Sequence, residues 1–507
     1  MVKFYITTAI PYVNAAPHIG FALELVQADV MARYHRRRGE DVLLLTGSDE
    51  NSLKNVKAAE KLKISTQELV DQNAQLFQDV ATGLNVSFEN FAKSTDKQAH
   101  WPGVEKLWNS LKKEDVYKKK YSGLYCPECE QFYKESELVE GLCPEHHIKP
   151  ELVEEENYFF KLSNYTKYIQ ELLTGGTLEV VPSHRKNEVL SFVKEGLEDF
   201  SISRSSTRAK GWGIPVPGDS SQIIYVWMDA LALYITGVGY GTDQASFDKW
   251  WPADVHEIGK GIIKFHALYW PALLKSAELQ MPKRIAVHGY VTIDGQKISK
   301  SLGNVINPLD LLKKYKADEI RYYLIRDIPT FQDGDFSESS LKNRINKELL
   351  GDLGNLVNRV LTLVENSKMT QFKRTEHPDA GNTGNHALME SFVENAAKEV
   401  DDCMGRLELG RAMDLTMSII RHCNGFVNQT EPWKLGDKPD VLEDVLYNLL
   451  EAIRISSKLL YPFLPETSES IEAKLGTKDV PKEFDCKFRG KFTEKTSKGE
   501  LLFKKVE

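Results

Sequence analysis

The chain has 507 residues, of which 41% are hydrophobic, and a formal net charge of −8 at pH 7. This length predicts several domains with a sizeable core. The negative net charge argues against nonspecific nucleic-acid binding over the whole surface, although a local basic face is compatible with it. No run of about eighteen apolar residues occurs, and the first residues lead directly into a strand-like pattern, so we expect no membrane span, no signal peptide and a cytoplasmic protein.

The N-terminal segment predicts a strand, a helix and a second strand. We interpret residues 3–9 as a buried strand, and apolar residues then recur at helical spacing from Ile19 to Val30. A second apolar run at 41–46 leads to Asp49. Elements of these lengths in this order favour a parallel sheet, which binds ligands at the carboxyl ends of its strands.

The middle of the chain predicts an insertion that splits this α/β fold. Between Tyr117 and Gly218 the sequence changes to short aromatic segments with cysteine pairs. We interpret Ile223–Trp227 and Ala286–His288 as strands that return to the parallel sheet, and we expect a helix around Ile262–Leu274.

The last third of the chain predicts helices. Apolar residues from Leu349 to Leu363 recur at spacings of four, three, four and three. Residues 376–386 are expected to form a loop, and Leu501-Leu502-Phe503 in the lysine-rich tail is a candidate to dock back on the body. The segments that we expect are 1–116 and 219–290 for the two halves of the α/β domain, 117–218 for the insertion, 291–345 for a lysine-loop and stem-contact region, 346–475 for the helical domain and 476–507 for the tail.

Two tight turns carry residues with metal-ligand chemistry. Cys126 and Cys129 are two residues apart, and so are Cys143 and His146 further along the chain. Three thiolates and one imidazole make a tetrahedral Zn²⁺ shell, and a closed shell of this kind is structural because it leaves no position for substrate. The alternatives are four buried side chains without metal, or His147 as the fourth ligand, although the spacing favours His146.

Two short motifs have the chemistry to bind a triphosphate. His18-Ile19-Gly20 lies where the first strand turns into a helix, and Lys297-Ile298-Ser299-Lys300-Ser301 places two ammonium groups and two hydroxyls in one loop. Alone, the histidine is better explained as a helix cap or core residue, and the lysine motif as a solvated loop. Together they favour a ligase that activates its substrate with a nucleotide.

Further motifs extend along most of the chain. They include Ala9-Ile10-Pro11-Tyr12-Val13-Asn14, Thr46-Gly47-Ser48-Asp49-Glu50, Tyr225-Val226-Trp227-Met228-Asp229-Ala230-Leu231, Ile258-Gly259-Lys260, Val287-His288-Gly289-Tyr290 and Glu431-Pro432-Trp433. With these motifs, from about Lys3 to about Leu475, the chain resembles the methionyl-tRNA synthetases, which are class I aminoacyl-tRNA synthetases, of the type with a single zinc knuckle.

This resemblance implies a fold and an activity. The fold would be a Rossmann-like catalytic domain split by the zinc-knuckle insertion and followed by an all-α domain that binds the anticodon. The activity would be ATP-dependent conversion of methionine to methionyl-adenylate, with Mg²⁺ accompanying ATP, and transfer of the methionyl group to the 3′ end of tRNA(Met). We expect one structural Zn²⁺ per chain and a monomer.

The resemblance also implies roles for individual residues. ATP would be bound by His18, Gly20, Phe21, Gly259, Lys260, Lys297 and Lys300, with His18, Lys297 and Lys300 as the catalytic groups. The methionine site would be formed by Ile10, Tyr12, Asp49, Trp227, Ala230, Leu231, Tyr234, Ile262 and His266, with Asp49 binding the amino group. The anticodon would be recognised by Asn355, Arg359 and Trp433, the indole stacking on an unpaired base. Without the family, most of these residues would be interpreted as core or bundle surface.

The chain departs from the family pattern mainly near the nucleotide. Phe21 stands where the family has a second histidine, Gly261 where it has aspartate, Asn51-Ser52 where it has His-Gly, and Ile298 where it has methionine. Loss of one oxyanion donor costs about 10²–10³ in rate.

These departures leave several interpretations open. The first is a working synthetase that uses other groups at the nucleotide, with Phe21 packing against the adenine or the sugar. The others are an impaired paralogue that binds tRNA without efficient aminoacylation, another class I adenylate-forming ligase, or a non-enzymatic RNA-binding protein. We favour the first, because His18, Asp49 and both lysines of the loop are present.

Overall fold

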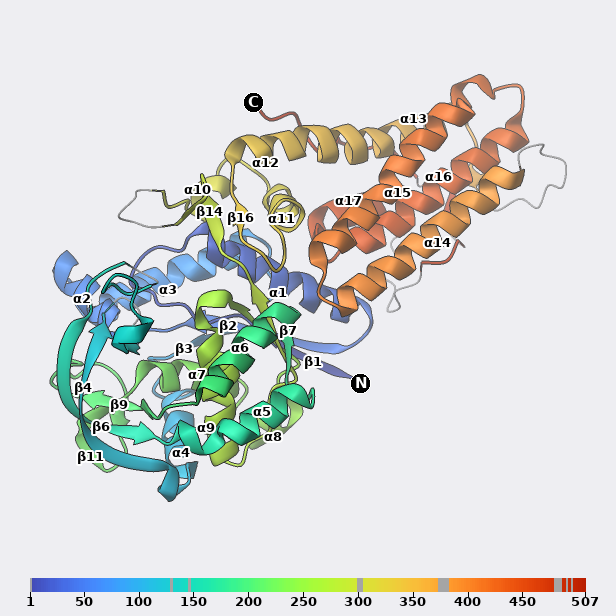
Figure 1. Cartoon of the computed structure of the whole chain (residues 1–507). Helices are drawn as coiled ribbons and strands as arrows, with labels where there is room; N and C mark the ends of the chain where they lie inside the picture. Colours follow the sequence, from blue (N-terminus) through green and yellow to red (C-terminus); the bar gives the residue numbers. More distant parts are fainter. Residues whose placement is uncertain are drawn as a thin grey trace.

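The computed structural model consists of an α/β body and an elongated helical part that projects from it (Figure 1). It describes residues 2–127, 131–144, 147–298, 304–372, 383–477, 486–488, 491–493 and 496–507. Within these ranges, no helix is long and apolar enough to cross a membrane.

A parallel sheet forms the centre of the α/β body. The described residues contribute six strands in the order β3-β2-β1-β12-β13-β7. Their bounds are Asn90–Lys93 (β3), Asp41–Ser48 (β2), Lys3–Thr7 (β1), Val255–Gly259 (β12), Arg284–His288 (β13) and Glu179–Val181 (β7). From β1 the chain continues to β2 on one side, whereas β12 lies on the other side. The strand order therefore reverses between β1 and β12, and α/β folds bind ligands in the crevice at such a switch point.

Helices cover both faces of this sheet. They are α1 (Ile19–Arg37), α2 (Leu53–Leu62), α3 (Thr66–Gly83), α4 (Trp101–Ser110), α7 (Val226–Thr236), α8 (Gln244–Trp250) and α9 (Trp270–Ser276). The helix α1 follows β1 directly, as predicted, and its last turn carries His35, Arg36 and Arg37, which suit the negative end of the helix dipole. Coverage on both faces explains why β1, β2, β12 and β13 are buried along almost their whole length.

The insertion is mainly antiparallel. One sheet has the order β5-β4-β6-β8, with β4 at Val116–Cys126, β5 at Gln131–Tyr133, β6 at Glu151–Phe160 and β8 at Phe200–Ser201. A smaller sheet contains β9 (Ser203–Ser205), β10 (Pro215–Val216) and β11 (Asp219–Ile224), and the helices are α5 (Thr166–Thr174) and α6 (Ser183–Glu195). Short turns are η1 (Lys113–Asp115), η2 (Glu135–Glu137) and η3 (Leu162–Tyr165). The strand β7 comes from this part of the sequence yet pairs with β13, so the insertion is joined to the main sheet.

The prediction of a returning strand at Ile223–Trp227 is wrong. Ile223 and Ile224 end β11, which pairs antiparallel with β9, and α7 begins at Val226. The returning strand is β12, which the sequence analysis missed, whereas the predicted strand at Ala286–His288 is confirmed as part of β13. A short apolar run is compatible with a buried strand, but it does not show which sheet the strand joins, because the partner strands are distant in sequence.

A hairpin precedes the lysine motif. The strands β14 (Val291–Ile293) and β15 (Gln296–Lys297) are joined by Asp294 and Gly295, both with positive φ, as a tight two-residue hairpin turn requires. The strand β16 (Gly334–Asp335) pairs with β14. The helices α10 (Pro308–Leu312) and α11 (Ala317–Arg326) follow the lysine motif and lead to the helical part.

The helical part begins with one long helix. Its successive segments are α12 (Glu338–Arg344), the π-helical η7 (Ile345–Gly354) and α13 (Asn355–Ser367), and the helices α14 (Thr383–Gly405), α15 (Leu409–Thr430), α16 (Pro439–Leu460) and α17 (Pro465–Leu475) pack with it. The predicted apolar stripe is confirmed, since Leu349, Leu353 and Leu356 are fully buried. Residues 376–382 of the predicted loop lie outside the described residues, whereas 383–386 belong to α14, so the predicted end of the loop is wrong. The predicted class, an α/β domain followed by an all-α part, is confirmed.

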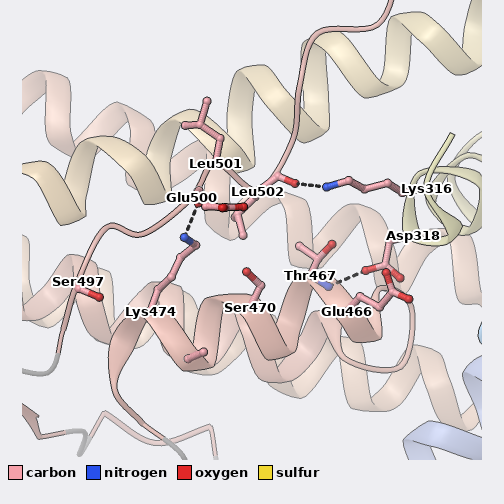
Figure 2. Close-up of a pocket in the computed structure, with 11 residues that line it drawn as sticks. Lys316, Asp318, Glu466, Thr467, Ser470, Lys474, Ser497, Glu500, Leu501 and Leu502 are labelled. Carbon is pink, nitrogen blue, oxygen red and sulfur yellow. Dashed lines mark hydrogen bonds between the residues drawn. The ribbon is translucent and has the colours of Figure 1, made fainter.

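The C-terminal tail docks on the body, as predicted. Phe503 is 1% exposed, and the ammonium of Lys316, the N-cap residue of α11, donates to the Leu502 carbonyl at 3.0 Å. From α17, Lys474 donates to the carbonyls of Lys498, at 2.6 Å, and Glu500. Figure 2 shows the tail passing over a cavity of about 490 Å³ between α11 and α17. Further back, β18 (Phe492–Thr493) pairs with β17 (Gln371–Phe372).

Candidate functional site

The N-terminus of α1 lies at the carboxyl end of β1. His18 caps this helix in extended conformation, and its exposed imidazole accepts a hydrogen bond at Nδ1 from the Gly20 amide, at 3.1 Å. A Cβ on Gly20 would lie 2.9 Å from the His18 ring, so only glycine lets the ring lie across the first turn. The arrangement places an imidazole where the helix dipole favours an anion.

The segment after the lysine motif contacts this same helix end. The Ile19 amide donates to the Ile306 carbonyl at 3.0 Å. On the other side of the motif, Lys297 ends β15, where its backbone pairs with Thr292. Lys300 and the Lys297 side chain lie outside what the structure describes. Both backbone anchors of the motif are therefore fixed, and one of them touches the first turn of α1.

The end of β12 lies across the switch point. Gly259 closes the strand, and η4 (Lys260–Ile262) follows. The Lys260 ammonium pairs with Asp333 at 2.7 Å and lies 4.6 Å from the centre of the Tyr290 ring. Gly259 and Lys260 were predicted here, and Tyr290 belongs to a motif that was given no role. Asp333 was not predicted, because its proximity to these residues arises only from the folded sheet.

Phe21 is a predicted nucleotide contact that the geometry does not support. Its ring is 7% exposed and packs against Phe77 of α3, with ring centroids 4.7 Å apart. The expectation that this ring packs against adenine or sugar is corrected, because position 21 lies on the face of α1 that is directed into the core.

Asp49 is held beside Tyr12 at the ends of β2 and β1. The two residues form a bridge between parallel chain segments, and the Asp49 amide donates to the Pro11 carbonyl at 2.8 Å. Asp49 is 2% exposed. The Asn55 side chain donates to the Asp49 carbonyl at 3.1 Å and to that of Glu50 at 2.8 Å, which fixes the turn after β2.

The Asn51-Ser52 departure has a structural explanation. The side-chain nitrogen Nδ2 of Asn51 donates to the Ser94 carbonyl and to the Asp229 carboxylate, both at 2.8 Å. The other oxygen of Asp229 lies 2.5 Å from His100 Nε2. Ser52 caps α2. The side chains of Asn51 and Ser52 therefore form hydrogen bonds within the protein. They stabilise the turn that follows Asp49.

Aromatic rings gather next to Asp49. The Trp227 indole stacks on Phe265, with centroids 3.6 Å apart and planes at 8°, and meets the Tyr12 ring edge-on at 6.1 Å. The Trp227 Nε1 atom is buried and has no acceptor within the described residues. Flat aromatic rings suit a flexible, polarisable thioether. One of these rings, Phe265 of the π-helical η5 (Phe265–Tyr269), was not predicted from the sequence.

Polar groups lie beneath these rings. The Tyr234 hydroxyl is 2.8 Å from His266 Nε2, and His266 Nδ1 is 3.0 Å from the Ile262 carbonyl, so Nδ1 carries the proton and Nε2 accepts from tyrosine. Burial lowers the pKa of His266 to about 4, which keeps it neutral at pH 7. Of the remaining predicted members, Leu231 belongs to the same apolar core, Ile10 packs against it, and Ala230 is buried.

A buried acidic cluster that the sequence analysis missed lies next to the crevice. His288 Nε2 is 2.8 Å from a Glu24 oxygen, and the other Glu24 oxygen accepts from the Ala9 amide at 2.6 Å. Burial raises the pKa of the neighbouring Glu257 to about 8. The cluster ties α1 to β12, β13 and the end of β1.

Two of the four predicted zinc ligands are described. Cys126, at the end of β4, and Cys143 are both fully buried in one small cluster with Tyr133. Two thiols brought together from separate turns fit a thiolate metal site. His147 is exposed, which disfavours it as the fourth ligand, whereas Cys129 and His146 lie outside the described residues.

The residues predicted to bind the anticodon lie together on the helical part. Trp433, in η8 (Pro432–Lys434), is 49% exposed, and the Arg359 guanidinium lies 4.9 Å from its ring centre. Asn428, which the sequence analysis missed, accepts from Arg359 at 2.9 Å. Asn355 is exposed one turn earlier on the same helix as Arg359. An exposed indole with a stacked guanidinium is suited to binding an unpaired base.

Known proteins share this architecture. The family model described as "tRNA synthetases class I (M)" matches residues 4–150 and 146–361. The methionine–tRNA ligase of Thermotoga maritima is 40% identical over an aligned length of 514 residues. The alignment covers 100% of this chain and 80% of that protein. The methionine–tRNA ligase of Synechocystis is 39% identical over 486 residues, covering 93% and 89%.

Solved structures of methionyl-tRNA synthetases are also similar to this chain. Mycobacterium tuberculosis methionyl-tRNA synthetase in complex with methionyl-adenylate matches with a TM-score of 0.90 and 36% identity, covering 96% of each chain. Its apo form matches with a TM-score of 0.86 and 33% identity, covering 100% of this chain and 99% of that one. The chain therefore belongs to the class I tRNA synthetases, in the methionine–tRNA ligase family.

Proposed function

We propose that the chain is a methionine–tRNA ligase, which activates methionine with ATP and transfers it to tRNA(Met). The single observation that supports this most is the Ile19–Ile306 hydrogen bond. It joins the segment after the lysine motif to the helix end that carries His18, at a switch point beside the aromatic group of Trp227 and Tyr12. The names of the relatives agree with this proposal.

In the first step, a methionine carboxylate oxygen attacks the α-phosphorus of ATP. The bond from that phosphorus to the β-phosphate oxygen breaks, and pyrophosphate leaves. His18 at the start of α1 would bind the phosphates, and Lys297 and Lys300 would neutralise charge on the departing pyrophosphate. Mg²⁺ would accompany ATP as part of the substrate.

Methionine would lie against the aromatic group. Trp227 and Tyr12 would flank the thioether, and the Asp49 carboxylate would bind the ammonium group. His266 is neutral because its pKa is about 4, and its protonation would place an unpaired charge in this apolar site. The His266–Tyr234 pair therefore favours an uncharged side chain in the substrate.

In the second step, a ribose hydroxyl of the tRNA's terminal adenosine attacks the methionyl carbonyl carbon, and AMP leaves. Asn355, Arg359 and Trp433 would bind the anticodon bases at the far end of the helical part. We also propose the segment boundaries given above, a monomeric state and a cytoplasmic location.

Zinc would have a structural role. Cys126, Cys129, Cys143 and His146 would bind it, and the metal would cross-link two turns of the insertion whose apolar cluster is small. The proposal rests on the burial of Cys126 and Cys143 side by side.

One assay tests the proposed reaction. ATP–pyrophosphate exchange is measured with each of the twenty amino acids, followed by charging of tRNA(Met). We expect exchange that depends on methionine, and charging that falls at least tenfold in Trp433→Ala while exchange is unchanged. Exchange with a different amino acid or organic acid would indicate another adenylate-forming ligase, and tRNA binding without any exchange would indicate a paralogue that has lost activity.

A further inference from the structure

A tryptophan of the insertion bonds to the turn after β2. Trp212 lies in the loop between β9 and β10, and its half-buried indole donates from Nε1 to the Glu50 carbonyl at 2.8 Å. Glu50 directly follows Asp49 in the sequence. A side chain of the insertion therefore holds the backbone beside the carboxylate that would bind the methionine ammonium.

The loop that carries Trp212 is itself held in place. Gly213 has a φ of +121°, which favours glycine, and a Cβ on it would lie 2.7 Å from the Ile223 side chain of β11. On the other side of the tryptophan, the Lys210 ammonium pairs with the Glu60 carboxylate of α2. The position of the indole is thus fixed by close contacts with β11 and α2.

Glu50 is fully buried and is bonded from several segments. Its amide donates to the Ser94 hydroxyl at 2.8 Å, and its carbonyl accepts from the Asn55 side chain at 2.8 Å as well as from Trp212. Ser94 follows β3 and Asn55 lies in α2, so the indole adds a bond from the insertion. Because Asp49 and Glu50 share a rigid, planar peptide group, a shift of that group would also move Asp49.

Binding of an ammonium group is sensitive to such a shift. A charge-assisted hydrogen bond between ammonium and carboxylate is short, with an optimum near about 2.7–2.9 Å. A displacement of about 1 Å, caused by a change away from the substrate, can cost about 10²-fold in rate. A residue that fixes the backbone next to Asp49 can therefore affect methionine binding without touching methionine.

We propose that Trp212 is a positioning residue, which holds Asp49 for the ammonium group of methionine through its bond to the Glu50 carbonyl. This inference rests on the proposed function. It makes the insertion a contributor to the amino-acid site, because the indole comes from the loop between β9 and β10, whereas Asp49 follows β2.

Trp212→Phe tests the proposal, because it removes the N–H donor and keeps an aromatic ring. In ATP–pyrophosphate exchange we expect the KM for methionine to rise about three- to tenfold, as loss of one neutral hydrogen bond predicts, with the KM for ATP unchanged. Trp251→Phe is the matched control. Its indole donates to the Gln280 carbonyl at 3.0 Å, before β13 and thus at the edge of the sheet opposite the crevice, so both KM values should equal those of the parent.

Two inhibitors of exchange separate positioning from a general loosening of the site. Methioninol carries the ammonium group and the thioether, whereas 4-(methylthio)butan-1-ol lacks the ammonium group. If Trp212 acts through Asp49, the inhibition constant of methioninol should rise in Trp212→Phe by the same factor as the KM for methionine. The inhibition constant of the analogue without the ammonium group should not change.

An unchanged KM for methionine in Trp212→Phe, or equal losses with both inhibitors, would overturn the proposal. Benzothienylalanine at position 212 replaces the N–H by sulfur and keeps the shape of the ring. It therefore allows the same comparison even if Trp212→Phe does not fold. Absence of methionine-dependent exchange in the parent enzyme would instead contradict the proposed function.

Discussion

At the scale of single residues, buried ionisable groups next to the crevice make stability depend on pH. Glu257 is 4% exposed, and its Oε1 has no partner within the described residues. Burial raises its pKa from 4.5 to about 8, so the folded state keeps a proton that the unfolded chain releases. The free energy of unfolding therefore falls as pH rises from about 4.5 to about 8.

Glu257→Gln should remove this dependence, because the amide has the same shape and does not ionise. Urea unfolding at a series of pH values should show a smaller loss of stability between pH 5 and pH 8 in the variant, by up to about 1.4 kcal/mol per pH unit. Glu105→Gln, on the exposed face of α4, is the matched control and should follow the parent. Parallel curves for the parent and Glu257→Gln would show that Glu257 ionises normally in the fold.

Some residues of the candidate site could be predicted from the sequence, and others could not. His18, Asp49 and Trp227 could be predicted because each belongs to a local motif at a strand or helix end. Phe21 could not, because its role depends on which face of α1 meets Phe77 in a distant helix. Asp333 gave no local signal, since its partners lie in loops that only the sheet brings together.

At the scale of elements, the two turns of the insertion should depend on metal. Purified chain should contain about one Zn²⁺, and a chelator should increase proteolysis and amide exchange within residues 117–218, because a structural site contributes folding energy directly. Cys126→Ser should lose the metal, whereas Cys486→Ser, in the tail, should retain it. Metal-free protein with unchanged protection of this segment would show that the four side chains are ordinary core residues.

The helices and strands also show which local sequence patterns are enough to predict secondary structure. The spacing that predicted α1 and the long helix through Leu349 is confirmed, because an amphipathic helix depends on neighbours three and four residues away. The strand predicted at Ile223–Trp227 failed, because a short apolar run is equally compatible with a helix start, which is what Val226 provides.

At the scale of the whole molecule, a buried charge network joins the α/β body to the helical part. Arg321 of α11 is fully buried, pairs with Asp29 of α1 at 2.7 Å, and donates to the carbonyls of Leu84, Pro462 and Phe463. These acceptors come from both parts of the structure. The network would keep the anticodon-binding end in a fixed orientation relative to the crevice.

Arg321→Met should lower the free energy of unfolding by about 3–5 kcal/mol, because it leaves buried acceptors without their donor. Arg326→Met, on the same helix but with its partners near the surface, should cost about 1 kcal/mol or less. Chemical denaturation of both variants measures the difference. Equal costs would mean that the buried network contributes no more than a surface ion pair.

The proposed function depends on His18 and the lysine motif acting on one nucleotide. A crystal structure of this chain with ATP and a methionine analogue that lacks the carboxylate tests this directly. We expect the His18 imidazole and the ammonium groups of Lys297 and Lys300 within hydrogen-bonding distance of the same triphosphate. A triphosphate bound away from the start of α1, with these side chains directed elsewhere, would contradict the proposed function.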